Sequence, residues 1–232
     1  FWGFSHVKQD FMPDTNRAQF TVDIWMPQGT HIDNTASTLT QVEKYVSTLD
    51  GVDRITSFIG RGPLRFLLTF SPEMPDSSYA QLLVDVDDFH RVPDMKKTIQ
   101  AWLDKQMPQV IGSVDAFKLG PGGGAVVARL SGPETQTLRR LAQKVMVLMA
   151  KHPNTRSIRT DWGQQIKAGS IEFADLRAQG LGLGRPEIAS SIAMNFTGAV
   201  VGQYRYKDDL LPIILQPPKS QRSTIDDLDD VQ

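Results

Sequence analysis

The feature that most constrains the fold of this 232-residue chain is a strand–turn–helix–strand pattern that occurs twice. In residues 18–26 apolar and polar side chains alternate, as they do in a strand with one buried face. A turn at Gly29 follows, then helical spacing of apolar residues over about 32–49 and a second strand at about 52–59. The same order returns over residues 125–163. We interpret the two copies as a duplication of one supersecondary unit.

The first copy continues into a larger unit. Further strands are expected at about 65–70, 79–87 and 110–119, and a helix is expected from Asp94 to the residue before Pro108. Helices that cover one face of an antiparallel sheet in this order are typical of a ferredoxin-like split βαβ subdomain. The predicted fold class is therefore α+β.

The second copy is shorter. It consists of a helix at about 135–151 between strands at about 125–130 and 155–161, so we expect only half of a βαβ subdomain there. After residue 163 the pattern changes. The expected elements are a strand at about 164–172, a short helix, a helix at 186–196, and a hairpin of two strands at about 199–206 and 210–216. They predict a further, partial α+β subdomain.

Charge and composition exclude several classes of function. The chain has 25 Lys plus Arg and 26 Asp plus Glu, so it carries no basic surface that would attract nucleic acid. It has no cysteine, and its four histidines have no His or Cys neighbour at metal-ligand spacing. It also lacks a nucleophile elbow, a recurring pair of catalytic carboxylates and a P-loop. We predict no enzymatic activity, no cofactor, no resident metal and no nucleic-acid partner.

Five stretches of the sequence together carry a resemblance to a known family. They are Phe11-Met12-Pro13-Asp14 with the strand that runs on to Thr30, Gly60-Arg61-Gly62-Pro63-Leu64-Arg65-Phe66, Tyr79-Ala80-Gln81-Leu82-Leu83-Val84, Arg159-Thr160-Asp161-Trp162-Gly163, and Val200-Val201-Gly202-Gln203-Tyr204-Arg205. In this order the stretches resemble the second periplasmic loop of resistance–nodulation–division (RND) efflux pumps. We place the chain in the hydrophobe and amphiphile branch of that family rather than in its heavy-metal branch.

The resemblance implies a map of domains. Its parts are a membrane-exit stub (1–16), a ferredoxin-like first porter subdomain (17–121), the first half of a second porter subdomain (122–162) and a partial docking subdomain (163–232). In the family the second half of that porter subdomain comes later in the polypeptide. The half-subdomain expected from the repeat agrees with this map.

The resemblance also implies a substrate cleft between the two porter subdomains and a switch-like loop beside it. The expected cleft residues are Thr21, Asp23, Trp25, Asp115, Phe117, Leu119 and Arg159. The expected switch-like loop consists of Gly60, Arg61, Gly62, Pro63, Leu64, Arg65 and Phe66, without an aromatic residue between its glycines. From the residues alone, the two aromatic side chains could instead pack against a neighbouring subdomain, and the charged ones could form ion pairs.

The function implied by the resemblance is the substrate-capture and conduit portion of a proton-driven pump that exports small amphiphilic molecules. It would lie on the periplasmic face of the bacterial inner membrane, in a homotrimer with a periplasmic adaptor protein and an outer-membrane channel. Two alternatives stay open: a heavy-metal efflux member of the same family, and a soluble ligand-sensing module of ferredoxin-like repeats. Three methionines that converge in the cleft would favour metal cargo, whereas aromatic and carboxylate side chains would disfavour it.

Overall fold

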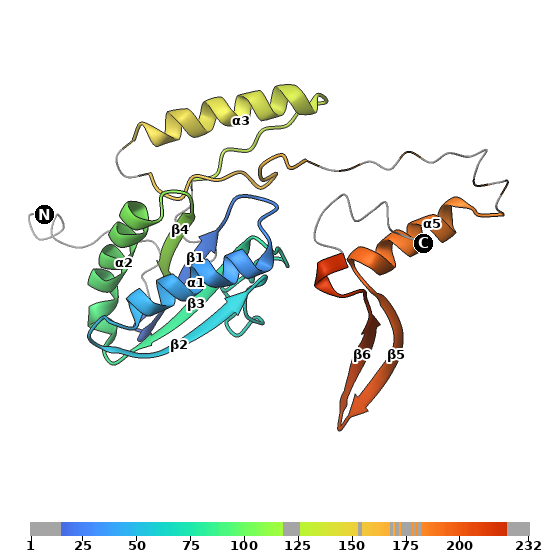
Figure 1. The fold of residues 1–232 in the computed structure, drawn as a ribbon. Helices are drawn as coiled ribbons and strands as arrows, with labels where there is room; N and C mark the ends of the chain where they lie inside the picture. Colours follow the sequence, from blue (N-terminus) through green and yellow to red (C-terminus); the bar gives the residue numbers. More distant parts are fainter. Residues whose placement is uncertain are drawn as a thin grey trace, which may run out of the picture. The chain divides into compact units, whose positions relative to one another are not determined.

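The computed structural model describes residues 15–117, 126–152, 155–167, 169, 172, 178, 180 and 182–221. The chain divides into two units, Phe1–Lys167 and Ala168–Gln232, and each is described here by itself. Figure 1 shows both units, coloured along the sequence. No helix among the described residues is long and apolar enough to cross a membrane.

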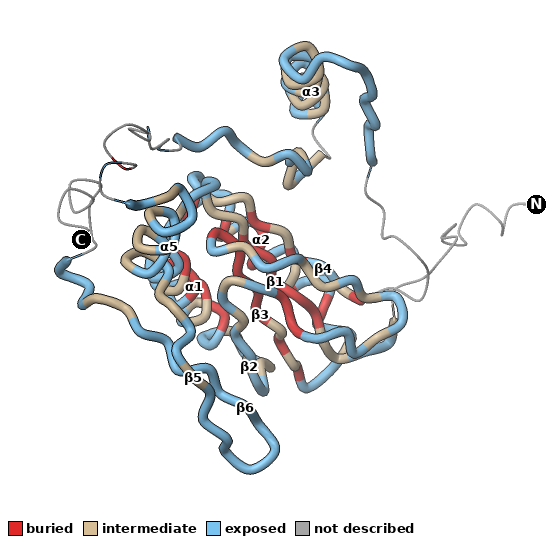
Figure 2. Tube along the Cα trace, turned by 90° about the vertical axis from the view of Figure 1, so that its right-hand side faces the viewer, coloured by how far each residue is buried: buried red, intermediate tan, exposed pale blue. Residues whose placement is uncertain are grey.

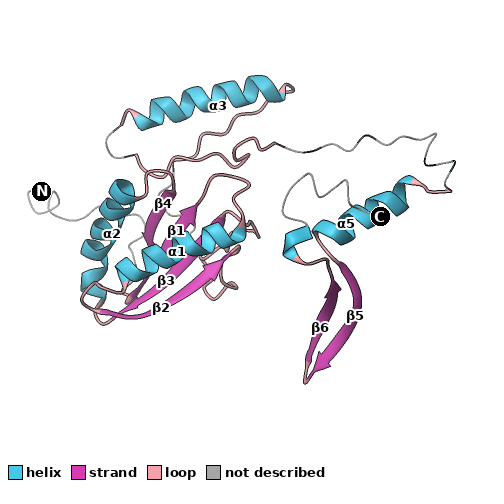
Figure 3. Cartoon of the chain, in the orientation of Figure 1, coloured by secondary structure: helices cyan, strands magenta, loops and turns pink. Residues whose placement is uncertain are grey.

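The first unit is built on a four-stranded antiparallel sheet with strand order β2-β3-β1-β4. Its elements are β1 (Gln19–Trp25), α1 (Ile32–Val46), β2 (Val52–Ile59), β3 (Tyr79–Val86), the 3₁₀ turn η2 (Phe89–Arg91), α2 (Val92–Gln106) and β4 (Ile111–Ala116). This element order and strand order form a split βαβ arrangement, as expected for this part of the chain (Figure 3). The antiparallel α+β class is therefore confirmed.

Local sequence signals explain where the two helices begin and end. The side chain of His31 accepts a hydrogen bond from the backbone N–H of Asp33 and so caps the start of α1. After α1 the chain turns at Gly51, whose φ of +89° is a conformation that residues with a Cβ rarely adopt. A proline in the first turn of α2 begins that helix without the loss of a helical hydrogen bond.

The hydrophobic core lies between the sheet and its two helices. Alternate β1 residues Phe20, Val22 and Ile24 face this core and are at most 1% exposed. The other core residues come from β3 (Ala80, Leu82, Val84, Val86), α1 (Leu39, Val42, Val46), α2 (Val92, Met95, Ile99, Leu103), β4 (Val114) and the residue after α2 (Met107). Figure 2 shows that the buried positions of the tube concentrate in these elements. The alternation read from the sequence thus sets which face of the sheet is apolar.

Several expected strands of the first unit do not form. Residues 65–70 belong to an irregular loop between β2 and β3, here called the β2–β3 loop (residues 60–78). The prediction of a strand there was wrong because Phe66 and Phe70 pack against the aromatic ring of Phe117 rather than extending the sheet. Strand propensity alone does not decide whether such a run pairs with a sheet edge or packs its side chains elsewhere.

The second copy of the repeat is confirmed only in its helix, α3 (Thr135–Ala150). Residues 126–130 and 155–161 were expected to be strands, but they have no regular secondary structure. Within the part of the chain that the structure describes, neither segment pairs with a strand. Without a ladder of backbone hydrogen bonds a segment is not a strand, whatever the pattern of its side chains.

The second unit contains α5 (Arg185–Phe196), β5 (Ala199–Tyr206), β6 (Asp209–Leu215) and the 3₁₀ turn η3 (Lys219–Gln221). The expected helix and hairpin are therefore confirmed within one or two residues. β5 and β6 form a two-stranded antiparallel sheet whose turn places Lys207 at a positive φ of 55°. The described residues at 164–167, 169 and 172 show no strand, so the strand expected at 164–172 is not confirmed.

Candidate functional site

The candidate site lies on the face of the sheet that is turned away from both helices. Thr21, Asp23 and Trp25 alternate with the core residues of β1 and therefore share this face. The strand register places Asp23 beside Gln81 of β3 on one side and beside Ser113 of β4 on the other. We call this group of side chains, together with Tyr79 and Asp115, the polar face.

Asp23 is the most perturbed carboxyl group of the polar face. It is only 8% exposed, and it accepts hydrogen bonds from the hydroxyl of Tyr79 (2.5 Å) and from Nε2 of Gln81 (2.6 Å). Burial raises the pKa of Asp23 to about 6, although hydrogen bonds from Tyr79, Thr21 and Gln81 oppose the change. The nearby charge of Asp115 raises this pKa further.

Tyr79 completes the hydrogen bonding around this carboxyl group. Burial, followed by the charge and hydrogen bond of Asp23, raises the pKa of the Tyr79 hydroxyl. The hydroxyl therefore stays protonated and remains a donor to Asp23 in the physiological pH range. Its ring also contacts the ring of Trp25, with the ring centroids 5.5 Å apart.

Gln81 leaves one acceptor of the polar face without a partner. Its side-chain oxygen Oε1 is buried and accepts no hydrogen bond from any residue that the structure describes. An unsatisfied buried polar group costs about 1–3 kcal/mol. Asp115, whose carboxylate accepts a hydrogen bond from Ser113 (2.5 Å), lies on the same face and is exposed. The polar face therefore combines two carboxyl groups with an amide oxygen that lacks a donor.

Arg159 reaches the polar face from a distant part of the sequence. Its guanidinium lies 3.9 Å from the centroid of the Trp25 ring and forms an ion pair with Glu73 (2.9 Å) of the β2–β3 loop. An ion pair was the alternative role considered for Arg159, and the structure contains it, together with a cation–π contact. Within the described residues Asp23 forms no ion pair, so its carboxyl group is held by neutral donors instead.

Phe117 lies at the end of β4 and belongs to an aromatic cluster. Its ring makes edge contacts with Phe66 (5.5 Å) and Phe70 (6.0 Å), and the guanidinium of Arg17 lies 5.8 Å from its centroid. Phe117 is only 7% exposed. The neighbouring side chains therefore cover the Phe117 ring and leave little of its surface for a ligand.

The expected switch-like loop, residues 60–66, is the first part of the β2–β3 loop. Gly62 and Pro63 are buried, whereas Leu64 is 88% exposed. Arg65 donates to the backbone carbonyl groups of Leu67 and Leu68. Leu119, the remaining expected cleft residue, lies outside the described residues.

The methionines do not converge on the polar face in the described part of the chain. Met95 and Met107 are buried in the core, and Met74 is 79% exposed. Met26 packs against the core, and the others lie on α3 (Met146, Met149) and α5 (Met194). The structure thus offers oxygen atoms rather than thioethers at the candidate site.

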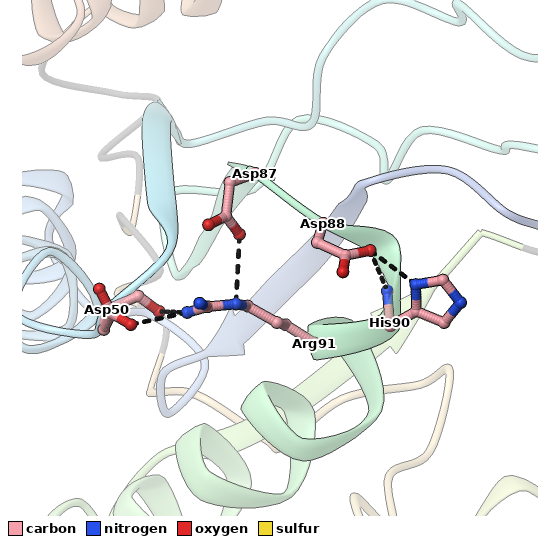
Figure 4. A network of polar contacts seen from close by, with 5 residues as sticks. All are labelled: Asp50, Asp87, Asp88, His90 and Arg91. Carbon is pink, nitrogen blue, oxygen red and sulfur yellow. Dashed lines mark hydrogen bonds and ion pairs between the residues drawn. The ribbon is translucent and has the colours of Figure 1, made fainter.

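A second polar network lies at the turns beside α2 and holds two turns together (Figure 4). Arg91 donates to the carboxylate of Asp50 (2.8 Å) and lies 3.5 Å from that of Asp87, and Asp88 contacts the ring of His90 (2.8 Å). The pKa of Asp50 is lowered by its hydrogen bond from Arg91 and by the positive charge there. A surface depression of about 360 Å³ adjoins this network but contains none of the expected cleft residues. Arg91 already pairs with the carboxylates of Asp50 and Asp87, so we assign this network to structure.

Sequence reasoning missed three residues of the site. Tyr79 and Gln81 alternate with the apolar residues of β3, so correct pairing of β3 with β1 would have placed both beside Asp23. Glu73 lies in an irregular loop. No sequence signal connects it with Arg159, 86 positions away.

Comparison with known proteins identifies the family. A model of the AcrB/AcrD/AcrF family matches residues 1–232. The chain belongs to this family. Its members are RND transporters, so the prediction that the chain is not an enzyme is confirmed, and so is the resemblance at the level of the family. The alternative of an unrelated ligand-sensing module loses its support.

Two proteins that are similar to this chain have names that refer to heavy metals. The nickel and cobalt resistance protein CnrA of Cupriavidus metallidurans is 22% identical over 234 residues, which cover 96% of this chain and 21% of CnrA. The crystal structure of a heavy metal efflux pump matches with a TM-score of 0.71 at 12% identity, over 96% of this chain and 24% of that one. The second likeness shows the fold alone. The chain spans between a fifth and a quarter of the length of these relatives, and neither name supports the expected amphiphile branch.

Proposed function

We propose that this chain is the periplasmic substrate-capture portion of a proton-driven RND pump that exports divalent heavy-metal cations. Membership of the AcrB/AcrD/AcrF family supports a pump, and the names of the two relatives favour metal cargo over amphiphilic molecules. The observation that carries the proposal is the polar face. There a buried carboxyl group, Asp23, lies beside an amide oxygen of Gln81 that has no donor among the described residues.

The donor atoms of the polar face suit divalent cations. Carboxylate, amide and hydroxyl oxygens are ligands of hard and borderline cations, whereas Cu(I) and Ag(I) prefer thioethers and thiolates. The expectation that carboxylates would disfavour metal cargo in general was too broad, because divalent cations accept oxygen ligands. We therefore propose that the cargo is a divalent ion of the nickel and cobalt kind, held by Asp23, Asp115 and Oε1 of Gln81.

Each residue of the polar face has a proposed role. Asp23 binds the cation when it is ionised, and Asp115 contributes a second negative charge at the solvent edge. Tyr79 orients the Asp23 carboxylate through its hydrogen bond, while Thr21 lies beside it on β1. Release would follow from a second conformation in which these oxygens bind the cation more weakly, since transport needs different affinities in two states.

The aromatic cluster argues against amphiphilic cargo at this face. A pocket for such molecules offers exposed apolar surface. Here Phe117 is buried against Phe66 and Phe70, and the guanidinium of Arg159 already lies against the ring of Trp25. The rings of Phe117 and Trp25 are thus already in contact with other side chains of this chain.

The finer assignments of the sequence analysis remain part of this proposal. They are the stub, porter and docking subdomains with their boundaries, the periplasmic location, the homotrimer, and the assembly with an adaptor protein and an outer-membrane channel. The split βαβ arrangement of the first unit supports its assignment as a porter subdomain. The separate unit from residue 168 onward supports a distinct docking part.

Metal tolerance of cells tests the proposal. The full-length parent protein would be expressed in bacteria that lack their own pumps, and growth would be measured in nickel, cobalt and zinc, with dye accumulation measured in parallel. We expect the parent to raise tolerance of at least one metal and Asp23→Asn to abolish the gain. Asp53→Asn, which neutralises an exposed carboxylate on β2, should leave tolerance unchanged. Lower dye accumulation with unchanged metal tolerance would reject metal cargo in favour of amphiphiles.

A further inference from the structure

We infer that Arg159 is a latch that closes residues 155–167 over the polar face and controls access to Asp23. This inference rests on the proposed function for its biological purpose, but its physical basis is independent of the cargo. The latch is one guanidinium that joins three segments far apart in the sequence. They are the end of β1 at Trp25, the β2–β3 loop at Glu73, and the segment after α3.

The segment 155–167 is attached to the sheet at several points. Oγ of Ser157 donates to the carbonyl oxygen of Gly112 in β4 (2.6 Å). A Cβ atom on Gly29 would lie only 3.1 Å from Cγ2 of Ile166, so the turn after β1 is in close contact with the far end of the segment. Arg159 lies between Ser157 and Ile166 in the sequence and adds a third, charged attachment. The segment therefore follows the sheet from β4 to the end of β1.

Three central residues of the polar face are buried although no helix covers them. Asp23, Tyr79 and Gln81 are between 1% and 8% exposed, yet both helices pack on the other side of the sheet. Two irregular segments approach this face at Trp25 and Tyr79, and the ion pair of Arg159 with Glu73 joins them. The charge of Glu73 raises the pKa of the Tyr79 hydroxyl, and the charge of Arg159 lowers it. The ion pair of these two residues therefore lies near the hydroxyl that donates to Asp23.

The strength of these contacts suits a device that opens. The side chains of Arg159 and Glu73 are 45% and 38% exposed, so water competes with their ion pair. The cation–π contact with Trp25 adds a comparable, modest stabilisation. A chain of contacts runs inward from the guanidinium through the rings of Trp25 and Tyr79 to the carboxylate of Asp23. Loss of the outermost contact therefore loosens the cover without damage to the core.

Hydrogen–deuterium exchange on the purified full-length pump tests the latch without any metal. In Arg159→Ala we expect amides of residues 155–167 and of the β2–β3 loop to exchange about tenfold faster than in the parent. The exchange of α1 and β2 should not change. Arg156→Ala is the matched control, since this exposed arginine, three positions earlier, forms no ion pair with any described residue. Equal exchange rates in the Arg159 variant and the parent would overturn the inference.

A double variant in which the two charges are swapped distinguishes a latch formed by the ion pair from a general structural role of Arg159. The double variant Glu73→Arg with Arg159→Glu restores the ion pair but not the contact with Trp25, so its exchange rate should lie between those of the parent and of Arg159→Ala. A rate as high as that of Arg159→Ala would show that the ion pair does not close the segment. The two proposals fail separately. If Arg159→Ala exchanges faster but the parent gives no metal tolerance, the latch stands and the proposed metal cargo is rejected. If the parent gives metal tolerance but exchange in Arg159→Ala is unchanged, the metal cargo stands and the latch is rejected.

Discussion

The raised pKa of Asp23 predicts an unusual dependence of stability on pH. Burial holds this pKa at about 6 in the folded chain, compared with about 3.8 when the group is free. Between these values the folded chain binds more protons at this group than the unfolded chain does. Its contribution to stability is therefore present below pH 4 and is lost as the pH rises through 6. This sign is opposite to that of an ion-paired carboxylate.

The magnitude follows from the shift in pKa. A difference of about two pKa units corresponds to about 3 kcal/mol, because each unit is worth about 1.4 kcal/mol. Asp23→Asn keeps the shape of the side chain but cannot ionise, so it lacks this contribution to the pH dependence. The unfolding free energy of the Asn variant minus that of the parent should therefore increase by about 2.5 kcal/mol between pH 4 and pH 7, since part of the full change lies below pH 4.

Urea unfolding of the 232-residue chain at steps of pH from 4 to 7.5, followed by circular dichroism, measures this difference. Asp50, Asp76 and Asp88, whose pKa values are lowered, make the opposite contribution in both proteins, so they cancel in the comparison. Tyr79→Phe removes a hydrogen bond that opposes the shift, and should move the pH midpoint upward. A difference between parent and Asn variant that does not depend on pH would refute the reasoning.

Two further predictions concern the first unit. Leu39→Ala removes a core side chain that is 1% exposed and should destabilise the chain by about 2–5 kcal/mol in urea unfolding, whereas Leu148→Ala, at a position on α3 that is 63% exposed, should cost about 0.5 kcal/mol or less. Equal effects of the two would contradict the assigned core. Gly112→Ala places a Cβ atom 2.9 Å from Cδ1 of Leu103, so it should cost about 1–3 kcal/mol by overpacking, measured in the same way. A neutral result would mean that α2 can move away from β4.

The parts of the fold that the sequence predicts are those set by a local pattern. The alternation of Phe20, Val22 and Ile24 with polar residues indicates both a strand and its buried face, and the structure confirms both. Helical spacing of apolar residues likewise predicts α1, α2 and α3. Each of these signals lies within about 20 consecutive residues, where period and side-chain direction are linked by backbone geometry.

The parts that the sequence does not predict depend on partners in space. Residues 65–70 are rich in strand-forming side chains, but the edge beside β2 stays unpaired and Phe66 turns to Phe117 instead. The candidate site shows the same limit. Alternation predicts that Thr21, Asp23 and Trp25 share a face, while the contact of Arg159 with Glu73 depends on how two irregular segments meet.

The proposed latch and the raised pKa of Asp23 are connected by one cause. Burial is the largest contribution to that pKa, and the proposed latch holds an irregular segment against the same face of the sheet. If the latch opens, water reaches Asp23 and its pKa falls toward the ordinary value, so the carboxylate ionises at neutral pH more completely. An open face then favours cation capture, and closure over an empty site raises the protonated fraction of the carboxyl group. Closure with a cation in place requires the oxygens of Asp23 and Gln81 to replace the water that the ion loses. The acceptor of Gln81 that has no donor among the described residues is the atom available for this exchange.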